Sequence, residues 1–329
     1  MPLAEGTAFV NRSLLLRLDY CLTPTTRINN AAIVVRNHRI QSLGGYSAFV
    51  HPERYDVIEM KNCYALPGFV DTHISGAARF DCMHADQDDD IAPMSRSLAQ
   101  HGVTSFVPTT HSTTHEHLLN VIAALRARTY DYSLPGAVPI SLHIDGPYLS
   151  PHKQRGAHEA KHVRAIDLGE VREVLECGRG AISVFTFAPE LDRAGELIGL
   201  LREHNVSPCM GHTAASERQI CRAIEAGANR CLHLYNGMDP LEQRKVGLAA
   251  CALIDDRIWV ELIPDGIHSH WRMVELACRC KAPEKIVGIS NATSAAGLPE
   301  GQYEFGDQKI IVHDSRSEEH TSELQSLLI

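Results

Sequence analysis

From residue 65 onward, short apolar runs alternate with helical stretches, and this alternation restricts the possible folds more than any other feature of the sequence. Two of the helical stretches, residues 113–129 and 214–226, place apolar side chains at positions i, i+3 and i+4. Strands that alternate with helices form parallel sheets. Eight candidate strands predict an α/β protein with a closed (β/α)8 barrel of the TIM type. They are residues 65–71, 105–109, 139–144, 182–187, 208–211, 230–232, 258–263 and 286–290.

The first sixty residues have a different pattern, with short strands and turns but no helical periodicity. Residues 31–35 and 40–43 read as two strands joined by a turn at residues 36–39. We therefore expect residues 1–60 to form the N-terminal β layer of a small accessory β-sandwich. Residues 61–315 would then form the barrel.

The last residues of the chain do not resemble a part of this fold. Residues 316–326 read RSEEHTSELQS, which resembles the in-frame translation of a sequencing-library adapter. Where a helix should follow the eighth strand, residues 303–312 instead read as a hairpin. We expect residues 316–329 to be a non-native tail after a C-terminally truncated barrel. The alternative is a genuine polar helix at the C-terminus.

Composition narrows the classes of partner. The net charge of −9 argues against nucleic acid, whose phosphates an acidic protein would repel. The sequence has neither a secretory signal nor an apolar run of about 18 residues, the length that a membrane-spanning helix needs. Ten scattered cysteines favour reduced thiols in a cytoplasmic protein. The nineteen histidines prompt a search for metal ligands.

Histidine and aspartate stand at the ends of several predicted strands. His73 follows the first strand, His143 and Asp145 end the third, and His212 and His233 follow the fifth and sixth. In a barrel of this type the carboxyl ends of the strands meet at one mouth. Imidazole and carboxylate groups that converge there suit a borderline metal such as zinc. The sequence therefore predicts a metal site.

Several of these segments resemble known motifs. Residues 67–73, Pro-Gly-Phe-Val-Asp-Thr-His, resemble the first-strand motif of the amidohydrolase superfamily. Other segments are similar to motifs of the N-acetylglucosamine-6-phosphate deacetylase family. These are His-Ile-Asp-Gly-Pro-Tyr at 143–148, Gly-Ala-His at 156–158, Gly-His-Thr at 211–213, His-Leu-Tyr-Asn-Gly-Met at 233–238 and Asp-Gly-Ile-His at 265–268. The similarity runs from about residue 30 to residue 313.

The resemblance implies a role for each matched residue. Asp145, His212 and His233 would hold one divalent ion, with zinc as the expected metal. His158 would donate a hydrogen bond to the acetamide oxygen of the substrate, where negative charge develops. The remaining substrate contacts would come from Ala157, Asn236, Gly237, Arg244 and His268. Arg244 and His268 match phosphate-binding positions, and in the family this arginine reaches in from a neighbouring subunit, which implies a homodimer.

Some of these assignments have alternatives. Arg244 and Lys245 are also consistent with a solvated pair of loop residues. His158 lies in a histidine-rich stretch with His152 and His162, so a shifted register is an alternative for this position. His143 is better explained as a group that orients a ligand than as a ligand itself.

The sequence departs from the family pattern at three positions. Ser75 replaces the second histidine of the first-strand His-x-His motif, and Asp145 replaces the usual metal-binding glutamate. Asn291 replaces the catalytic aspartate, which in the family takes a proton from the attacking water and passes it to the leaving amine. A neutral amide has no basic lone pair for this task, and Glu261 and Asp265 are the carboxylates predicted nearby.

Three functional hypotheses remain at this point. The first is hydrolysis of N-acetyl-D-glucosamine 6-phosphate to D-glucosamine 6-phosphate and acetate. The second is a catalytically impaired or non-catalytic relative that binds the phosphosugar, because of Asn291. The third is a dihydropyrimidinase-like enzyme. Such enzymes usually bridge two metals with a carboxylated lysine on strand four, and residues 182–187 contain no lysine.

Overall fold

The computed structural model describes residues 13–37, 39–49, 51, 54–305, 308–313 and 316–319. The chain divides into two compact units on either side of the bond between Gly68 and Phe69. In the described part of the chain, no helix has the length and apolar character needed to cross a membrane.

The first unit contains a four-stranded sheet in the order β3-β2-β1-β4. Its strands are β1 (Leu14–Leu22), β2 (Arg27–Arg36), β3 (Arg39–Gly45) and β4 (Asp56–Ala65). β1 pairs antiparallel with β2 and parallel with β4. The predicted strands at residues 31–35 and 40–43 are confirmed within β2 and β3, and β4 runs across residue 60, where the sequence suggested a domain boundary.

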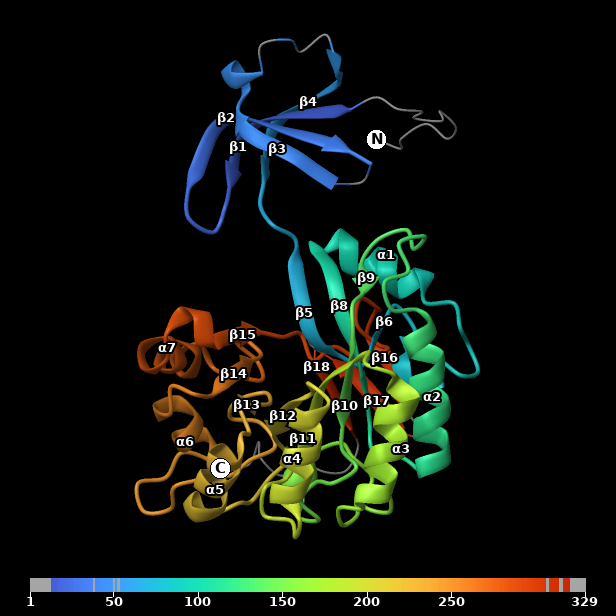
Figure 1. Cartoon of the computed structure of the whole chain (residues 1–329), viewed down its shortest axis with the longest axis vertical. Coiled ribbons are helices and arrows are strands. Elements are labelled where there is room, and N and C mark those ends of the chain that lie inside the picture. Colours follow the sequence, from blue (N-terminus) through green and yellow to red (C-terminus); the bar gives the residue numbers. More distant parts are fainter. Residues whose placement is uncertain are drawn as a thin grey trace. The chain divides into compact units, whose positions relative to one another are not determined.

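The second unit is a nearly closed barrel of eight parallel strands, which confirms the predicted α/β fold class (Figure 1). The strands are paired in the order β15-β14-β13-β12-β11-β10-β8-β5. Their bounds are β5 Phe69–Ile74, β8 Val103–Thr110, β10 Leu142–Asp145, β11 Ile182–Phe187, β12 Ser207–Met210, β13 Arg230–Cys231, β14 Trp259–Leu262 and β15 Ile286–Gly288. Val184, Cys209 and Leu232 form a small buried cluster separate from the main core.

Helices flank the strands, and their buried faces form the main core with the outer side chains of the strands (Figure 1). They are α1 Ala92–Gln100, α2 His115–Ala127, α3 Leu168–Gly178, α4 Ala194–Glu203, α5 Glu217–Ala226, α6 Leu248–Ile254 and α7 Trp271–Cys280. Both predicted helices are confirmed, with shorter bounds. α5 begins at Glu217 because Ser216 and Gln219 form a capping box that ends the preceding loop.

Two predicted strands had wrong bounds. Residues 65–71 do not form one strand, since Ala65 ends β4 and β5 begins only at Phe69, after Pro67 and Gly68. Residues 139–144 are divided into β9 (Val138–Pro139) and β10. Proline has no N–H group to donate to a sheet, which explains the break at Pro67. The second break lies after Pro139, which itself pairs with Phe106 in β8.

The remaining short strands lie in two small sheets. β6 (Gly76–Ala77) pairs with β7 (Phe80–Asp81), and β16 (Gly301–Phe305) pairs with β17 (Gln308–His313). The hairpin predicted at residues 303–312 is thus confirmed. β18 (Arg316–Glu319) pairs antiparallel with β17, so a helix at these residues was the wrong alternative. The non-native origin of the tail stays a prediction, and residues 320–329 lie outside the described residues.

Asp71 joins the first and the last barrel strand. Its carboxylate accepts hydrogen bonds from the Ser290 N–H at 3.2 Å, the Ser290 hydroxyl at 2.5 Å and the His73 N–H at 3.3 Å. Two main-chain bonds lie beside this contact, from the Asn291 N–H to the His73 oxygen and from the Ser75 N–H to the Ala292 oxygen. Side-chain and loop contacts therefore join β5 to the segment that follows β15.

We expect Asp71→Ala to lower the free energy of unfolding of the barrel by about 2–3 kcal/mol, because it removes three hydrogen bonds of a buried carboxylate and leaves the buried His73 N–H without this acceptor. Asp131→Ala is the matched control. Asp131 also accepts from the N–H and hydroxyl of one serine, Ser133, but in an exposed turn, so its loss should cost under about 1 kcal/mol. Urea denaturation followed by tryptophan fluorescence measures both changes, since both tryptophans belong to the second unit. Equal losses in the two variants would contradict the closing role of Asp71.

Candidate metal centre

The side chains that could bind a metal ion come from the carboxyl ends of the barrel strands. Asp145 ends β10, His73 lies near the end of β5, and His212 and His233 follow β12 and β13. His212 and His233 have positive φ angles of 48° and 26°, a conformation that non-glycine residues rarely adopt. Backbone strain of this kind is often found at functional sites.

Asp145 lies among three histidines. Its Oδ2 atom is 3.4 Å from Nε2 of His158, 3.6 Å from Nε2 of His212 and 4.0 Å from Nε2 of His73. Burial acts to raise the pKa of Asp145, but the imidazoles of His212 and His158 lower it well below its usual value. The other carboxylate oxygen, Oδ1, is buried and has no hydrogen-bond partner among the described residues. A charged, buried carboxylate with an unpaired oxygen and nearby imidazoles fits a cation.

The spacing of the donor atoms also fits a tetrahedral ion. Two ligands on zinc lie about 3.3 Å apart, because two bonds of roughly 2.05 Å meet at a tetrahedral angle. Nε2 of His212 is 3.0 Å from Nε2 of His233 and 3.6 Å from Oδ2 of Asp145. The first distance is slightly shorter and the second slightly longer than the expected separation of about 3.3 Å between two zinc ligands.

The group of three donors that lie within 4.8 Å of one another, however, consists of Asp145, His158 and His212. His233 lies outside this group of three but next to it, with its Nε2 atom 3.0 Å from Nε2 of His212. The structure thus brings two of the three predicted ligands together and adds His158, which the resemblance assigned to the substrate.

Main-chain partners distinguish the roles of His158 and His212. Nδ1 of His212 lies 2.9 Å from the carbonyl oxygen of Gln154. A carbonyl can only accept, so Nδ1 carries a proton and Nε2 can offer its lone pair to an ion once it is deprotonated. Nδ1 of His158 accepts from the Ser112 N–H at 3.1 Å. A backbone N–H can only donate, so the ring proton of neutral His158 is on Nε2, the atom that faces Asp145.

His212 is therefore suited to be a ligand and His158 to be a hydrogen-bond donor. Burial acts to lower the pKa of His212, but the Asp145 carboxylate raises it above its ordinary value. A proton and a cation thus compete for Nε2 of His212, and we expect cation binding to weaken as the pH falls through that pKa.

Gly237 packs directly against both predicted histidine ligands. A Cβ atom at this position would lie 2.9 Å from Nδ1 of His212 and 3.1 Å from Cε1 of His233, and the φ angle is +57°. A residue with a side chain would be strained there and would displace the imidazoles. The glycine that the resemblance assigned to substrate contact is therefore also required by the geometry of the site.

We expect Gly237→Ala to weaken zinc binding by at least about 10-fold. This is the lower end of the loss of metal affinity seen when a residue that holds a metal ligand in place is replaced. Gly199→Ala is the matched control, because Gly199 lies within α4 and a Cβ there has no neighbour within 4 Å. That change should leave zinc affinity unaltered and favour the helix by about 0.5–1 kcal/mol. Competition with a chromophoric chelator measures the affinity. An unchanged affinity in the Gly237 variant would show that the imidazoles do not need this close packing.

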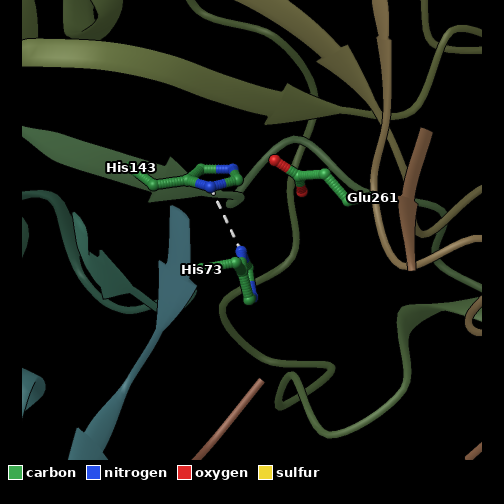
Figure 2. Close-up of side chains that lie close together, drawn as sticks. All are labelled: His73, His143 and Glu261. Carbon is green, nitrogen blue, oxygen red and sulfur yellow. Dashed lines mark hydrogen bonds between the residues drawn. The ribbon is translucent and has the colours of Figure 1, made fainter. Parts of the chain in front are cut away.

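A second buried group lies next to the first and consists of His73, His143 and Glu261 (Figure 2). Nδ1 of His73 is 3.1 Å from Nδ1 of His143. Glu261 accepts from Arg230 at 2.6 Å and from the Thr72 hydroxyl at 3.3 Å, both at Oε1. Burial raises the pKa of Glu261, opposed by Arg230. Both contacts engage Oε1, whereas Oε2 is buried and has no hydrogen-bond partner among the described residues.

The other residues predicted for the substrate lie at the edge of this centre or outside it. Asn236 is half-buried and donates to the Leu234 oxygen, and Ala157 packs against Ala295. Arg244 and His268 are exposed. His268 pairs with Asp265 at 2.7 Å, so Asp265 is also engaged. The phosphate-binding roles of Arg244 and His268 stay predictions.

The two remaining departures from the family pattern lie at the same mouth. The Asn291 N–H donates to the main-chain oxygen of His73 at 3.1 Å, and the φ angle of Asn291 is 50°. The Ser75 hydroxyl lies 3.0 Å from Nε2 of His111, whose ring centroid is 4.9 Å from that of His158. The imidazole of His111, which follows β8, therefore lies beside Ser75, the position of the second histidine in the family's His-x-His motif.

Sequence reasoning missed several residues of the site. His111 and Ser112 directly follow β8, so the rule that strand ends meet at one mouth was a signal for them. Gln154 acts through its main-chain oxygen, which no residue pattern reveals, whereas Ser112 contacts His158 through both its N–H and its hydroxyl. The ion pair of Arg230 with Glu261 joins two neighbouring strands and had no signal of its own.

Comparisons with known proteins agree on one kind of relative. The chain is 33% identical over 279 residues to an N-acetylgalactosamine-6-phosphate deacetylase of Escherichia coli O157:H7, covering 84% of this chain and 72% of that protein. It is 33% identical over 302 residues to an N-acetylglucosamine-6-phosphate deacetylase of Bacillus subtilis, covering 91% and 76%. No model of a protein family matched the chain.

A solved structure with a similar fold is an aspartate-to-alanine variant of N-acetyl-D-glucosamine-6-phosphate deacetylase from Mycobacterium smegmatis. It was solved in complex with N-acetyl-D-glucosamine 6-phosphate. The TM-score is 0.85 at 29% sequence identity, and the match covers 95% of this chain and 79% of that one. The sequence and structure comparisons therefore point to the same group of enzymes.

Proposed function

Because the chain belongs to the N-acetylglucosamine-6-phosphate deacetylase family of the amidohydrolase superfamily, we propose that it hydrolyses N-acetyl-D-glucosamine 6-phosphate to D-glucosamine 6-phosphate and acetate. The observation that carries the proposal is the buried, charged Asp145 among imidazoles at the barrel mouth. Family membership supports a deacetylase-type amidohydrolase, and the centre offers donors for the ion that such chemistry uses.

Asp145, His212 and His233 would hold the ion, with zinc as the proposed metal. When bound, a divalent ion supplies the Lewis acidity that activates water and polarises a carbonyl group. His158 presents its Nε2–H group beside Asp145, where it can donate to the acetamide oxygen as negative charge develops. The Ser112 N–H holds the ring in this tautomer, so the donor needs no reorganisation.

Arg244 and His268 would bind the 6-phosphate, and Asn236, Gly237 and Ala157 would contact the sugar. Arg244 is exposed, and a guanidinium can form bidentate bonds to a phosphate. Its supply by a second copy of the chain, as the resemblance implies, makes a homodimer part of the proposal. A cytoplasmic location is proposed as well, because all ten cysteines are free thiols, which is usual in a reducing compartment.

Purified, zinc-loaded protein tests the proposal by acetate release. The E. coli relative is named for the galacto epimer, N-acetylgalactosamine 6-phosphate. The assay therefore offers three substrates: the gluco 6-phosphate, the galacto 6-phosphate and unphosphorylated N-acetylglucosamine. We expect release from the gluco 6-phosphate and weak release from the unphosphorylated sugar. A folded, metal-loaded sample that releases no acetate from any of them would reject the proposed reaction.

Asn291 favours a second candidate function, a relative that binds the phosphosugar but cleaves it slowly or not at all. The residue lies at the barrel mouth, next to His73, where a carboxylate would be needed to move a proton. Calorimetric binding of the phosphosugar without measurable turnover would support this candidate, and fast turnover by the unmodified chain would exclude it.

A further inference from the structure

Asp239 is a buried carboxylate in the loop between β13 and α6, with an exposed fraction of 8%. Its Oδ1 atom accepts a hydrogen bond from Nε2 of Gln154 at 2.6 Å, and its Oδ2 atom accepts one from Nζ of Lys245, also at 2.6 Å. Both contacting nitrogens can only donate, so residue 239 must accept on two sides at once. A carboxylate meets this requirement, because each of its two oxygens is an acceptor.

Gln154 belongs to the loop that follows β10 and is the one buried residue among residues 151–157, all of which the structure describes. The Oε1 atom of its amide is buried and has no hydrogen-bond partner among the described residues. The bond from Nε2 to Asp239 therefore orients this side chain. Because the neighbouring residues of the loop are exposed or half-buried, the contact between Gln154 and Asp239 is where the middle of the loop is attached to the barrel.

The same loop packs directly on the imidazole of His212. The main-chain oxygen of Gln154 lies 2.9 Å from Nδ1 of His212. A Cβ atom at Gly156 would lie 3.2 Å from Cε1 of the same ring, and a Cβ atom at Gly237 would lie 3.2 Å from the Gln154 oxygen. With so little space between the loop and the ring, a shift of the loop would change the position of His212, one of the proposed metal ligands.

The main chain just before Asp239 has contacts of its own. The Thr213 N–H donates to the main-chain oxygen of Gly237 at 3.0 Å, and Thr213 forms an isolated parallel bridge with Met238. These bonds join the segment before Asp239 to the residue that directly follows His212. Asp239 is therefore held in place independently of Gln154 and can serve as a fixed point for the loop.

Lys245 contributes less to this arrangement than Gln154 does. Its side chain is 62% exposed, whereas Gln154 and Asp239 are both buried. Exposed ion pairs contribute little to stability, but a hydrogen bond that a buried carboxylate accepts is strong. The ammonium group of Lys245 is thus engaged by Asp239 but is not what holds the loop.

We propose that Asp239 is a positioning residue for the metal centre: it anchors the loop of residues 151–157 through Gln154, and the anchored loop holds the ring of His212 in the orientation that binds the ion. Gln154 has two functions in this account, since its side chain receives the anchor and its main-chain oxygen contacts the ligand. The part that concerns the ion rests on the proposed function, whereas the anchoring of the loop does not.

Trypsin tests the anchoring, because the loop itself carries two cleavage sites, after Lys153 and after Arg155. A loop opens more often when the contact that anchors it is lost, and cleavage follows the population of the open form. In the metal-free full-length chain we expect Asp239→Ala to speed cleavage at these two sites by at least about 10-fold, and Gln154→Leu to do the same. Mass spectrometry of the fragments identifies the sites.

Two further variants are controls. Asp255→Ala removes a carboxylate that pairs with Arg257 at 2.6 Å in the loop between α6 and β14, at the amino end of a barrel strand. It should leave cleavage in the loop of residues 151–157 unchanged. Lys245→Met removes the exposed contact of Asp239 and keeps the buried one, so it should change cleavage in that loop by less than about 5-fold.

Zinc affinity, measured by competition with a chromophoric chelator, tests the effect on the ion. We expect Asp239→Ala and Gln154→Leu to weaken zinc binding by about 10- to 100-fold, the range seen when a residue that supports a metal ligand is replaced. Asp255→Ala should bind zinc as the parent does. Should Asp239→Ala fail to fold, Gln154→Leu decides by the same two readouts.

The proposal is overturned if Asp239→Ala is cleaved in the loop no faster than Asp255→Ala. It is also overturned if the loop opens in Asp239→Ala but zinc is bound as tightly as by the parent, because the anchor would then not act on the ligand. Cleavage is measured without metal or substrate. A parent protein that releases no acetate therefore rejects the proposed reaction and leaves the test of the anchor intact.

Discussion

Asn291→Asp should raise the rate of acetate release by about 10²- to 10⁴-fold, the usual contribution of a positioned general acid–base. The amide of Asn291 cannot take up a proton from water or give one to the leaving amine, whereas a carboxylate can do both. The Asn291 N–H donates a hydrogen bond of 3.1 Å to the main-chain oxygen of His73. A carboxylate at residue 291 would therefore lie at the barrel mouth. Steady-state kinetics on the zinc-loaded parent and variant measure the change in kcat.

The backbone should accept this substitution without strain. Asn291 has a φ angle of 50°, and aspartate tolerates the left-handed region about as well as asparagine. Asn205→Asp is the matched control, because Asn205 has a φ of 58° in the exposed loop between α4 and β12, before the amino end of a barrel strand. It introduces the same charge away from the mouth and should leave the rate unchanged. A parent enzyme that is already fast, with no gain in Asn291→Asp, would mean that another group moves the proton.

The second prediction with a large expected effect distinguishes the roles of two histidines that lie almost equally far from Asp145. Their Nε2 atoms are 3.4 Å (His158) and 3.6 Å (His212) from the same carboxylate oxygen. We expect His212→Gln to lose bound zinc and to reduce turnover by more than about 100-fold, the upper end of the cost of losing a supporting residue. We expect His158→Gln to keep its zinc and to lose about 10²- to 10³-fold in kcat, as when an oxyanion donor is removed.

The two histidines are expected to differ because different main-chain groups contact their Nδ1 atoms. The Gln154 carbonyl requires a proton on Nδ1 of His212, and the Ser112 N–H requires a lone pair on Nδ1 of His158. Metal analysis after gel filtration, combined with kinetics at saturating zinc, distinguishes loss of the ion from loss of the donor. If His158→Gln releases zinc as readily as His212→Gln does, His158 is a ligand and the tautomer assignment is wrong.

Much of the barrel could be predicted from the sequence, because each strand is a short apolar run with its own boundary signals. Residues 182–187 coincide with β11, and the other strands were located to within a few residues except where a predicted strand is divided in two. Pro67 was visible in the sequence as a signal for one of these breaks, but the apolar residues around it favoured a continuous strand. Barrel closure through Asp71 and Ser290 was not predictable, since it joins residues 219 positions apart.

The metal centre was predictable in kind but not in detail. Residues at strand ends converge in any barrel of this type, and the structure brings Asp145 and His212 together with His233 next to them. Which histidine is a ligand and which a donor depends on the main-chain atoms of Ser112 and Gln154, which are determined by loop conformation. The neutralisation of Glu261 by Arg230 likewise follows from strand order, which places β13 beside β14.

The metal content of the folded protein decides whether Asp145, His212 and His233 hold a cation. The full chain is incubated with zinc, passed through a desalting column, confirmed as folded by circular dichroism and analysed by inductively coupled plasma mass spectrometry. We expect about one zinc ion per chain, the number that a single centre of this ligand type holds. A well-folded preparation that contains no bound transition metal after this treatment would contradict the metal centre and the hydrolytic function proposed from it.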